Sequence, residues 1–317
     1  MDWLGLNLDT PSGDQVVQVS VQMNNTGAVR TGEITVETED GSIEIIIPVT
    51  QQPFVEHVIS LPAGWSGLSN YALPLPPFVE DVFSGIMDEL VIALTEDGIF
   101  YPEYSVNTIG MWEAFSAYKI KTNAAVDLEI YGSAYPTKTM DIPAGWSLLP
   151  VISECDVDVE MLFAGVMDDV IMVKDIAGYG VFWPDMNINT IGVLQPGRAY
   201  YVKMNSKGNV EFPACSKSQN LTGSVNLTGL EDLPGFGIAQ TSSTHTIAIL
   251  PEALNAIEPG IIIVAYDQNG NCFGATEIAG DNNYITIFGD DPTTTEKDGF
   301  FEGEMICFKN LTGFGNL

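Results

Sequence analysis

An internal duplication is the feature that most constrains how this chain of 317 residues can fold. Four stretches occur twice in the same order, at an offset of 80 to 82 residues. An offset this constant predicts two copies of one folded unit with the same succession of elements. The matching stretches are LPAGWSGLSN (61–70) and IPAGWSLLPV (142–151), VFSGIMDELVI (82–92) and LFAGVMDDVIM (162–172), VNTIG (106–110) and INTIG (188–192), and AYKIKTN (117–123) and AYYVKMN (199–205).

The pattern inside each copy is typical of short strands with one short helix. Apolar side chains within residues 79–86 recur at i, i+3, i+4 and i+7, the spacing of a helix with one buried face. Gly85 lies inside this span, so a helix of only two or three turns is expected. Asp97-Gly98 lies between two apolar runs and predicts a hairpin turn.

Four parts follow from these patterns, and together they predict a mostly β chain. We call residues 1–53 the N-terminal unit, 54–135 repeat A, 136–215 repeat B and 216–317 the C-terminal unit. The C-terminal unit is expected to be a β-sandwich-like domain with a short helix that begins at a proline and a hairpin turn at Asn269-Gly270.

The N-terminal unit carries a pattern that resembles a known family. Trp3, the stretch NNTGAVRTGEITV (24–36) and the stretch IPVTQQ (47–52) are similar to the BACON domain, a small immunoglobulin-like module of surface and secreted proteins of Bacteroidetes. The resemblance implies an antiparallel sandwich with one buried face on each sheet. It also implies a spacer or a carbohydrate-binding role.

The rest of the chain also resembles modules of large secreted Bacteroidetes proteins, which often lie near the sorting domain of the type IX secretion pathway. The similarity rests on the repeated GWS, NTIG and AYxxK stretches and on FGDDPTTTEKDGF (288–300). It implies an extracellular or cell-surface protein, with neighbouring domains of a longer parent chain as partners. It implies no particular activity.

The charge balance argues against two classes of partner. There are 42 acidic and 11 basic residues, giving a formal net charge of −31, which repels the phosphates of nucleic acids and anionic membranes. No run of 18 apolar residues is present, and the first residues, MDWLGLNLDT, lack the basic and apolar regions of a secretory leader. Neither nucleic-acid binding nor membrane insertion is expected.

The four cysteines predict disulfides rather than a metal site. Cys155 and Cys215 both belong to repeat B, and repeat A lacks both thiols together, as expected for a bonded pair. Cys272 and Cys307 are a second candidate pair, as a cross-strand bridge. No C-x-x-C stretch occurs and the chain has only two histidines, so zinc is not expected.

An acidic loop in the C-terminal unit is the candidate metal site. Asp290, Asp291, Glu296 and Asp298 lie on a Thr- and Pro-rich loop, and clustered carboxylates of this kind bind calcium. The alternative is a solvated turn in a chain that is acidic throughout. The stretch DQNGN (267–271) lacks the later glutamate of a calcium loop and is read more simply as a hairpin turn.

Aromatic residues are the candidates for glycan binding, because sugar rings stack on exposed aromatic faces. Trp112, Tyr104 and Trp183 are the residues that we consider for this role. Trp65 and Trp146 hold equivalent places in the two copies, which predicts a repeated core residue rather than two ligand sites.

Catalytic patterns are weak. Ser66 and Ser147 follow Gly-Trp but lie in no G-x-S-x-G stretch. The adjacent acidic pairs at 88–89 and 168–169 point in different directions, whereas the two carboxylates of a glycosidase face each other. We therefore do not expect an enzyme.

Two classes of function stay open. The first is a structural spacer of a modular surface or secreted protein, with a cell-surface partner if it is adhesive. The second is an array of carbohydrate-binding modules. The repeated NTIG stretch does not decide between them, because its Asn and Gly predict a structural corner, with Gly110 and Gly192 at positive φ.

Overall fold

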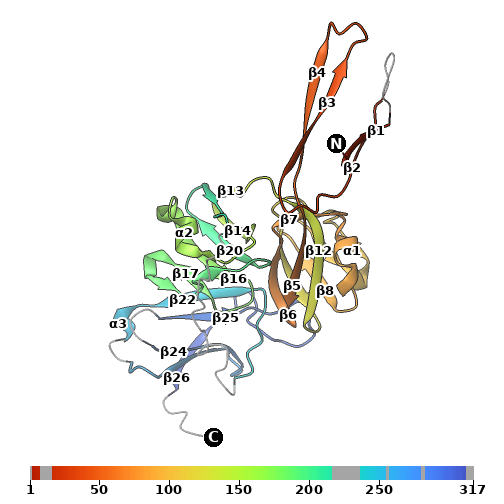
Figure 1. The fold of residues 1–317 in the computed structure, drawn as a ribbon. Helices are drawn as coiled ribbons and strands as arrows, with labels where there is room; N and C mark the ends of the chain where they lie inside the picture. The colour runs from red at the N-terminus through yellow and green to blue at the C-terminus, as the bar shows by residue number, and fades with distance from the viewer. Residues whose placement is uncertain (1, 8–15, 216–235, 255–256, 280–282, 312–317) are drawn as a thin grey trace.

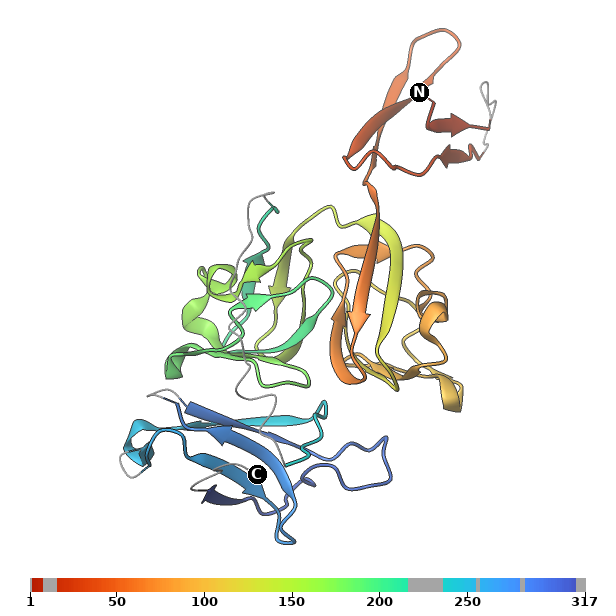
Figure 2. The same cartoon turned by 60° about the horizontal axis from the view of Figure 1, so that its bottom comes forward.

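The computed structural model describes residues 2–7, 16–215, 236–254, 257–279 and 283–311, and antiparallel strands dominate this part of the chain. Repeats A and B lie side by side, the C-terminal unit lies against both, and the N-terminal unit extends away from them (Figures 1 and 2). The predicted mostly β class is confirmed. No helix in the described ranges is long and apolar enough to cross a membrane.

Repeat A forms two antiparallel sheets around one core. The larger sheet has the order β10-β9-β8-β11-β6, and the smaller has the order β5-β12-β7. Apolar side chains from both sheets and from the helical segment between β7 and β8 fill the space between them. The strands are β5 (Phe54–Leu61), β6 (Gly64–Ser69), β7 (Ala72–Pro74), β8 (Leu90–Leu94), β9 (Ile99–Tyr101), β10 (Val106–Asn107), β11 (Ala117–Thr122) and β12 (Val126–Ala134).

Repeat B has the same topology, as the duplication predicts. Its larger sheet, β14-β20-β16-β17-β18, matches the five-stranded sheet of repeat A strand for strand, and β13 pairs with β21 as β5 pairs with β12. The additional pair β15-β19 corresponds to an isolated bridge between Phe78 and Met111 in repeat A. The strands are β13 (Thr139–Ile142), β14 (Gly145–Pro150), β15 (Val157–Asp158), β16 (Val170–Asp175), β17 (Val181–Trp183), β18 (Ile188–Asn189), β19 (Val193–Leu194), β20 (Ala199–Met204) and β21 (Gly208–Glu211).

The helical segments are shorter than the predicted two or three turns, because a single α-helical turn is followed by a separate 3-10 turn in each repeat. In repeat A, Val79, Phe83 and Ile86 are buried in the core, as their spacing predicts. The segments of the two repeats lie on opposite outer flanks of the pair (Figure 1). They are α1 (Val79–Val82), η1 (Ser84–Ile86) and η2 (Pro102–Tyr104) in repeat A, and α2 (Val159–Phe163), η3 (Met167–Asp169) and η4 (Pro184–Met186) in repeat B.

The NTIG stretch is a structural corner in both copies. The Asn107 side chain accepts a hydrogen bond from the backbone N–H of Gly110 at 2.8 Å and donates one to Glu80 at 3.0 Å. Its counterpart Asn189 makes the same two kinds of bond, at 2.9 and 2.8 Å. Gly110 and Gly192 have φ of 73° and 64°, which confirms the predicted backbone. The corner ties the end of β10 or β18 to the helical segment.

The two repeats pack through equivalent strands, so an approximate two-fold axis relates them. Strand β6 contacts β20, and the equivalent strand β14 contacts β11. On one side of this axis, Ser69 N–H donates to the backbone oxygen of Gly197 at 2.9 Å, and its hydroxyl accepts from Val151 N–H at 3.0 Å. On the other side, Leu148 N–H donates to Glu96 at 2.8 Å.

Gly67 sets the distance between the repeats. A Cβ at this position would lie 2.0 Å from the backbone oxygen of Ala199 and 2.9 Å from a methyl carbon of Ile176. The equivalent residue of repeat B is Leu148, which packs beside Ala117 and Ala199. At one half of the interface the backbones of the two repeats therefore lie in close contact, and at the other half the Leu148 side chain fills the space between them.

The substitution Gly67→Ala is expected to destabilise the protein by about 2 kcal/mol, because overpacking forces backbone to move. Gly85→Ala is the control, since a Cβ there meets nothing within 4 Å. Urea unfolding of both variants measures the difference. Equal stabilities of the two variants would contradict the assigned contact between β6 and β20.

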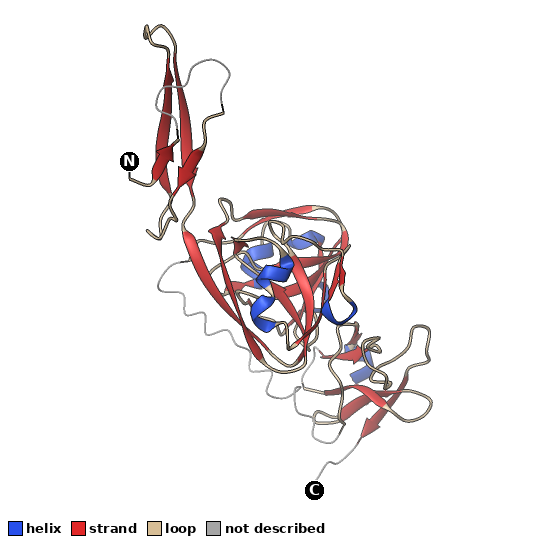
Figure 3. Cartoon of the chain, turned by 90° about the vertical axis from the view of Figure 1, so that its right-hand side faces the viewer, coloured by secondary structure: helices blue, strands red, loops and turns tan. Residues whose placement is uncertain are grey.

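The N-terminal unit consists of two separate two-stranded sheets, β1-β2 and β3-β4 (Figure 3). On the β3-β4 hairpin, one face is mainly apolar, and the other carries Thr and Glu side chains together with Ile46 and Pro48. The apolar face is not covered: Val36, Ile45 and Ile47 are about half exposed. The buried face that the alternation predicts for each sheet is therefore absent from the described residues, because the two hairpins do not stack. The strands are β1 (Leu4–Leu6), β2 (Val19–Val21), β3 (Arg30–Glu37) and β4 (Glu44–Gln51).

The base of this unit is held by polar contacts. Buried Asn24 donates hydrogen bonds from its amide to the backbone oxygens of Ala28 and Gln51, at 2.9 and 3.1 Å. The Arg30 guanidinium carbon lies 4.4 Å from the centroid of the Trp3 ring. Trp3 therefore joins β1 to the foot of β3 rather than filling a core.

Within its described residues, the C-terminal unit forms one five-stranded sheet with the order β22-β25-β24-β23-β26. Its turn at Asn269-Gly270 is confirmed, with Gly270 at φ 89°, and its helix begins at a proline. Apolar residues such as Phe273 and Ile285 form its core. The elements are β22 (Thr244–Ile249), α3 (Pro251–Leu254), β23 (Ile262–Tyr266), β24 (Cys272–Glu277), β25 (Asn283–Phe288) and β26 (Cys307–Leu311).

Candidate functional site

A cluster of an indole, an ammonium and a carboxylate joins repeat A to the C-terminal unit. Trp65 on β6 and Lys121 on β11 are directly paired across the strands, so their side chains lie on the same face of the sheet. Asp291, in the loop after β25, reaches this face. One of its carboxylate oxygens accepts hydrogen bonds from the indole N–H of Trp65 at 2.6 Å and from the ammonium of Lys121 at 2.7 Å.

The second oxygen of Asp291 fixes the loop that carries it. It accepts hydrogen bonds from the backbone N–H and the hydroxyl of Thr293, at 2.9 and 2.8 Å. The Thr293 hydroxyl in turn accepts from Lys121 at 2.7 Å. The Asp291 side chain is 3% exposed and that of Lys121 is 16% exposed, so the ion pair is largely shielded from water.

The surroundings keep Asp291 ionised. Burial raises the pKa of this carboxyl, but the hydrogen bonds from Lys121, the Thr293 backbone and Trp65 lower it more, and the net pKa lies below its ordinary value of 3.8. The Trp65–Lys121–Asp291 cluster can therefore hold one carboxylate firmly.

The substitution Asp291→Ala is expected to destabilise the protein by about 3 kcal/mol, because it leaves the Lys121 ammonium without its partner in a shielded place. Asp290→Ala is the control, since its carboxylate accepts a hydrogen bond from the backbone N–H of Asp298, at 3.1 Å, and has no ion pair in the described ranges. Guanidinium unfolding at neutral pH measures the two changes.

The same pair of variants has a pH signature. Because the folded-state pKa of Asp291 is lowered, its stabilisation is fully present above its ordinary pKa of 3.8 and is lost as the pH falls through the lower folded value. The stability difference between wild type and Asp291→Ala should therefore shrink below that pH. A difference that stays constant under acid would contradict the ion pair.

Repeat B meets the C-terminal unit through different side chains. Lys174 on β16 donates to the backbone oxygen and the hydroxyl of Thr244, at 2.7 and 2.8 Å. Burial lowers the pKa of Lys174 to about 8. Tyr284 on β25 lies 2.6 Å from the Thr190 hydroxyl of the second NTIG stretch and donates to the backbone oxygen of Tyr179, also at 2.6 Å.

The acidic loop uses its carboxylates mainly for contacts within the protein. Asp291 belongs to the cluster with Trp65 and Lys121. The Asp298 carboxylate accepts a hydrogen bond from the backbone N–H of Asp291, and the Asp290 carboxylate accepts one from the backbone N–H of Asp298. Glu296 is exposed. In the described ranges, no three acidic, histidine or cysteine side chains converge in a way that could hold a metal ion. Calcium binding by this loop stays a prediction.

The DQNGN stretch is a hairpin turn, as the sequence indicates. Asp267 accepts hydrogen bonds from the backbone N–H groups of Asn269 and Asn271, both at 2.9 Å. Its other oxygen lies 2.7 Å from the Lys297 ammonium, which also bonds Glu304 at 2.6 Å. Hydrogen bonding to Lys297 outweighs burial and holds the pKa of Asp267 well below its usual range.

The aromatic candidates lie in three different environments. Trp112 is 1% exposed and packs against Tyr118 with ring centroids 4.4 Å apart, so the prediction of a glycan platform is wrong for this residue. Trp183 is partly buried against the apolar cluster around Met172. Tyr104 is 64% exposed and makes an edge contact with Tyr101 at 4.6 Å. The structure does not bring Trp112, Tyr104 and Trp183 together into one platform.

The prediction of two equivalent core tryptophans is wrong, because only Trp65 is buried and it lies outside the core cluster of its repeat. Trp65 is 6% exposed, whereas Trp146 is 47% exposed. The reason is that Trp65 is covered by the C-terminal unit, and Trp146 is not covered by it to the same extent. Burial of this position therefore comes from a contact between units and not from the core of the repeat.

Two clefts border the contact between the repeats, and the approximate two-fold axis exchanges them. One, of about 490 Å³, lies beside Ser147 and Glu96, and the other, of about 380 Å³, lies beside Ser66 and Ile176. The hydroxyls of Ser66 and Ser147 are buried and have no hydrogen-bond partner in the described part of the chain. No histidine is among the described residues that line either cleft.

The chain was compared with protein-family models, with curated protein sequences and with solved structures, and none of the three comparisons finds a match. The resemblance of the N-terminal unit to the BACON domain therefore stays a prediction.

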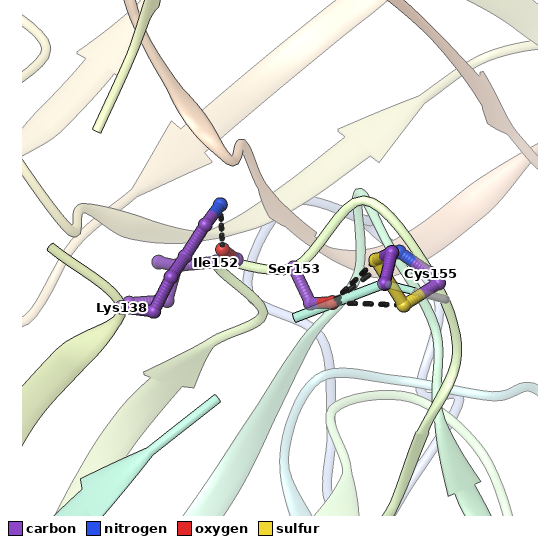
Figure 4. Close-up of a disulfide and its surroundings, with 5 residues drawn as sticks. Lys138, Ile152, Ser153 and Cys155 are labelled. Carbon is purple, nitrogen blue, oxygen red and sulfur yellow. Dashed lines mark hydrogen bonds between the residues drawn. A yellow bond between two sulfur atoms is a disulfide. The ribbon is translucent and has the colours of Figure 1, made fainter. Parts of the chain in front are cut away.

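The predicted Cys155–Cys215 disulfide is present, with an S–S distance of 2.15 Å (Figure 4). The Ser153 hydroxyl lies 3.4 and 3.5 Å from its two sulfur atoms. The bond connects the loop after β14 to the segment after β21. It therefore links the segment after the first two strands of repeat B to the end of the repeat, and its loop of 60 residues is long enough to stabilise the fold by about 4 kcal/mol.

The second predicted disulfide is wrong, because Cys272 and Cys307 are free. Both residues lie opposite Tyr266, but β24 and β26 are on opposite sides of β23. Two strand spacings separate them by about 9–10 Å, beyond the span of about 7 Å that a disulfide can bridge. Burial raises the pKa of the Cys272 thiol, which keeps it protonated.

The thiol count of the purified protein tests this assignment. Unfolded without a reductant, the chain should release two titratable thiols, those of Cys272 and Cys307, and after reduction it should release four. Titration with Ellman's reagent in guanidinium measures both values. Four thiols before reduction would contradict the Cys155–Cys215 bond.

The lysines of the site were not predicted from the sequence. Lys121 and Lys174 carry the contacts with the C-terminal unit, and only 11 basic residues occur in the chain. The available signal was the repeat itself, in which Lys121 corresponds to Lys203 and Trp65 corresponds to Trp146.

Proposed function

We propose that this chain is a non-catalytic structural segment of a modular surface or secreted protein, in which repeat A, repeat B and the C-terminal unit act as one rigid spacer. The observation that carries the proposal is the Trp65–Lys121–Asp291 cluster. Its three side chains could have formed a ligand site, but each is engaged by the others across two units.

The remaining contacts between units support the same role. Gly67 allows the backbones of the repeats to approach, and Lys174 and Tyr284 attach the C-terminal unit to repeat B. The three parts thus contact one another in pairs, an arrangement that resists bending more than parts joined only by flexible linkers.

The Cys155–Cys215 disulfide supports an extracellular location. Disulfides persist in oxidising compartments and are rare in the reducing cytosol. A bond that closes repeat B over 60 residues would be most useful to a module exposed outside the cell.

Carbohydrate binding is the alternative function, and Tyr104 is the residue that favours it. Its ring is 64% exposed beside Tyr101, as a sugar-stacking residue would be. Retention of the protein on an insoluble polysaccharide, lost in Tyr104→Ala, would support this alternative over the spacer.

Small-angle X-ray scattering tests the spacer. Scattering of residues 54–317 should fit one rigid arrangement of the three parts, and the fit should not change with ionic strength up to about 0.5 M, because the joining contacts are shielded. The double variant Lys121→Ala/Lys174→Ala should show a larger radius of gyration and a flexible profile. A flexible wild-type profile would overturn the proposal.

A further inference from the structure

Repeat B carries an uncovered counterpart of the residues that bind Asp291 in repeat A. Trp146 and Lys203 are directly paired across β14 and β20, as Trp65 and Lys121 are paired across β6 and β11. The Lys203 ammonium lies 5.4 Å from the centroid of the Trp146 ring, compared with 6.0 Å for the pair in repeat A.

The two pairs differ in what lies over them. Trp65 is buried beneath the Asp291 loop, whereas Trp146 is 47% exposed and makes an edge contact with Tyr201, with centroids 6.1 Å apart. The C-terminal unit contacts Tyr201 through the backbone oxygen of Ser242. The C-terminal unit therefore contacts Tyr201, whose ring lies beside Trp146, but leaves about half of the Trp146 surface exposed to solvent.

The charges around Trp146 are not balanced within the described residues. Besides Lys203, the buried ammonium of Lys174 lies 5.1 Å from the centroid of the Trp146 ring. In the described part of the chain, neither lysine has a carboxylate within ion-pair distance. Thr244 supplies both hydrogen-bond acceptors of Lys174, and both are uncharged. Two unbalanced cations beside one indole are notable in a chain with 42 acidic residues.

We propose that Trp146 and Lys203 form a second carboxylate-binding site, which docks an acidic turn of another polypeptide onto repeat B as the Asp291 turn docks onto repeat A. The carboxylate would accept hydrogen bonds from the indole N–H and the Lys203 ammonium. Lys174 adds positive potential beside the site, since a buried ammonium is poorly screened.

The geometry within this chain favours a polypeptide over a sugar acid. In repeat A the same pair binds an aspartate whose second oxygen holds its own turn through Thr293. The Asp291 turn of a second copy is not available, because its carboxylate is buried in its own cluster. The partner is therefore a different protein or module that presents an acidic turn. This site does not depend on the proposed rigidity of the spacer.

The indole N–H signal of Trp146 in a two-dimensional ¹H–¹⁵N spectrum tests the site. The chain has five tryptophans, and Trp146→Phe identifies the relevant peak by its loss. The probe is a synthetic peptide of residues 288–301, which carries the Asp291 turn. Titration at low salt should shift the Trp146 peak in a saturable way and leave the Trp112 peak unchanged, because Trp112 is buried.

Matched variants separate the proposal from adventitious binding. A peptide with Asp291→Asn, and the protein variant Lys203→Ala, should each bind at least tenfold more weakly. Tyr104→Ala removes an exposed aromatic residue of repeat A and should bind as wild type does. An unmoved Trp146 peak at millimolar peptide, or equal shifts with the Asn peptide, would overturn the site. Saturable binding of an oligogalacturonate without binding of the peptide would overturn the polypeptide partner.

Discussion

The shielded carboxylate of Asp291 is the interaction on which the arrangement of this molecule depends. An ionised group that is 3% exposed must be matched by donors, and Trp65, Lys121 and Thr293 supply them. Because an indole and an ammonium must both point at one oxygen, the loop docks onto repeat A in a single register. The directions of these hydrogen bonds therefore make the contact selective for a carboxylate in this position.

The duplication supplies one scaffold with two different outer surfaces. The order of strands in the larger sheet and the hydrogen bonds of the NTIG corner are the same in both copies, so the two sequences form the same fold. The outer face of the larger sheet has diverged: Lys119 of repeat A corresponds to Tyr201, and Leu94 corresponds to Lys174. These changes determine which part of the C-terminal unit each repeat contacts.

Local patterns were sufficient for the elements of the fold but not for the contacts between units. The helix over 79–86, the glycine turns and the Cys155–Cys215 bond follow from spacing, turn chemistry and the comparison of two copies. The burial of Trp65 could not be predicted, because it depends on an aspartate 226 residues further along the chain. The β3-β4 hairpin alternates like a buried strand pair, yet alternation indicates only which face is apolar and not whether anything covers it.

The difference between Gly67 and Leu148 makes the two copies unlike each other at their shared interface. At the half of the interface where β6 meets β20 there is room only for hydrogen, and at the other half a leucine side chain fills the space. If the sequence of repeat B replaced that of repeat A, a leucine would stand at position 67, where even a Cβ would lie 2.0 Å from the backbone oxygen of Ala199. The duplicated modules have therefore become distinct parts, and gene conversion between them would damage the protein rather than repair it.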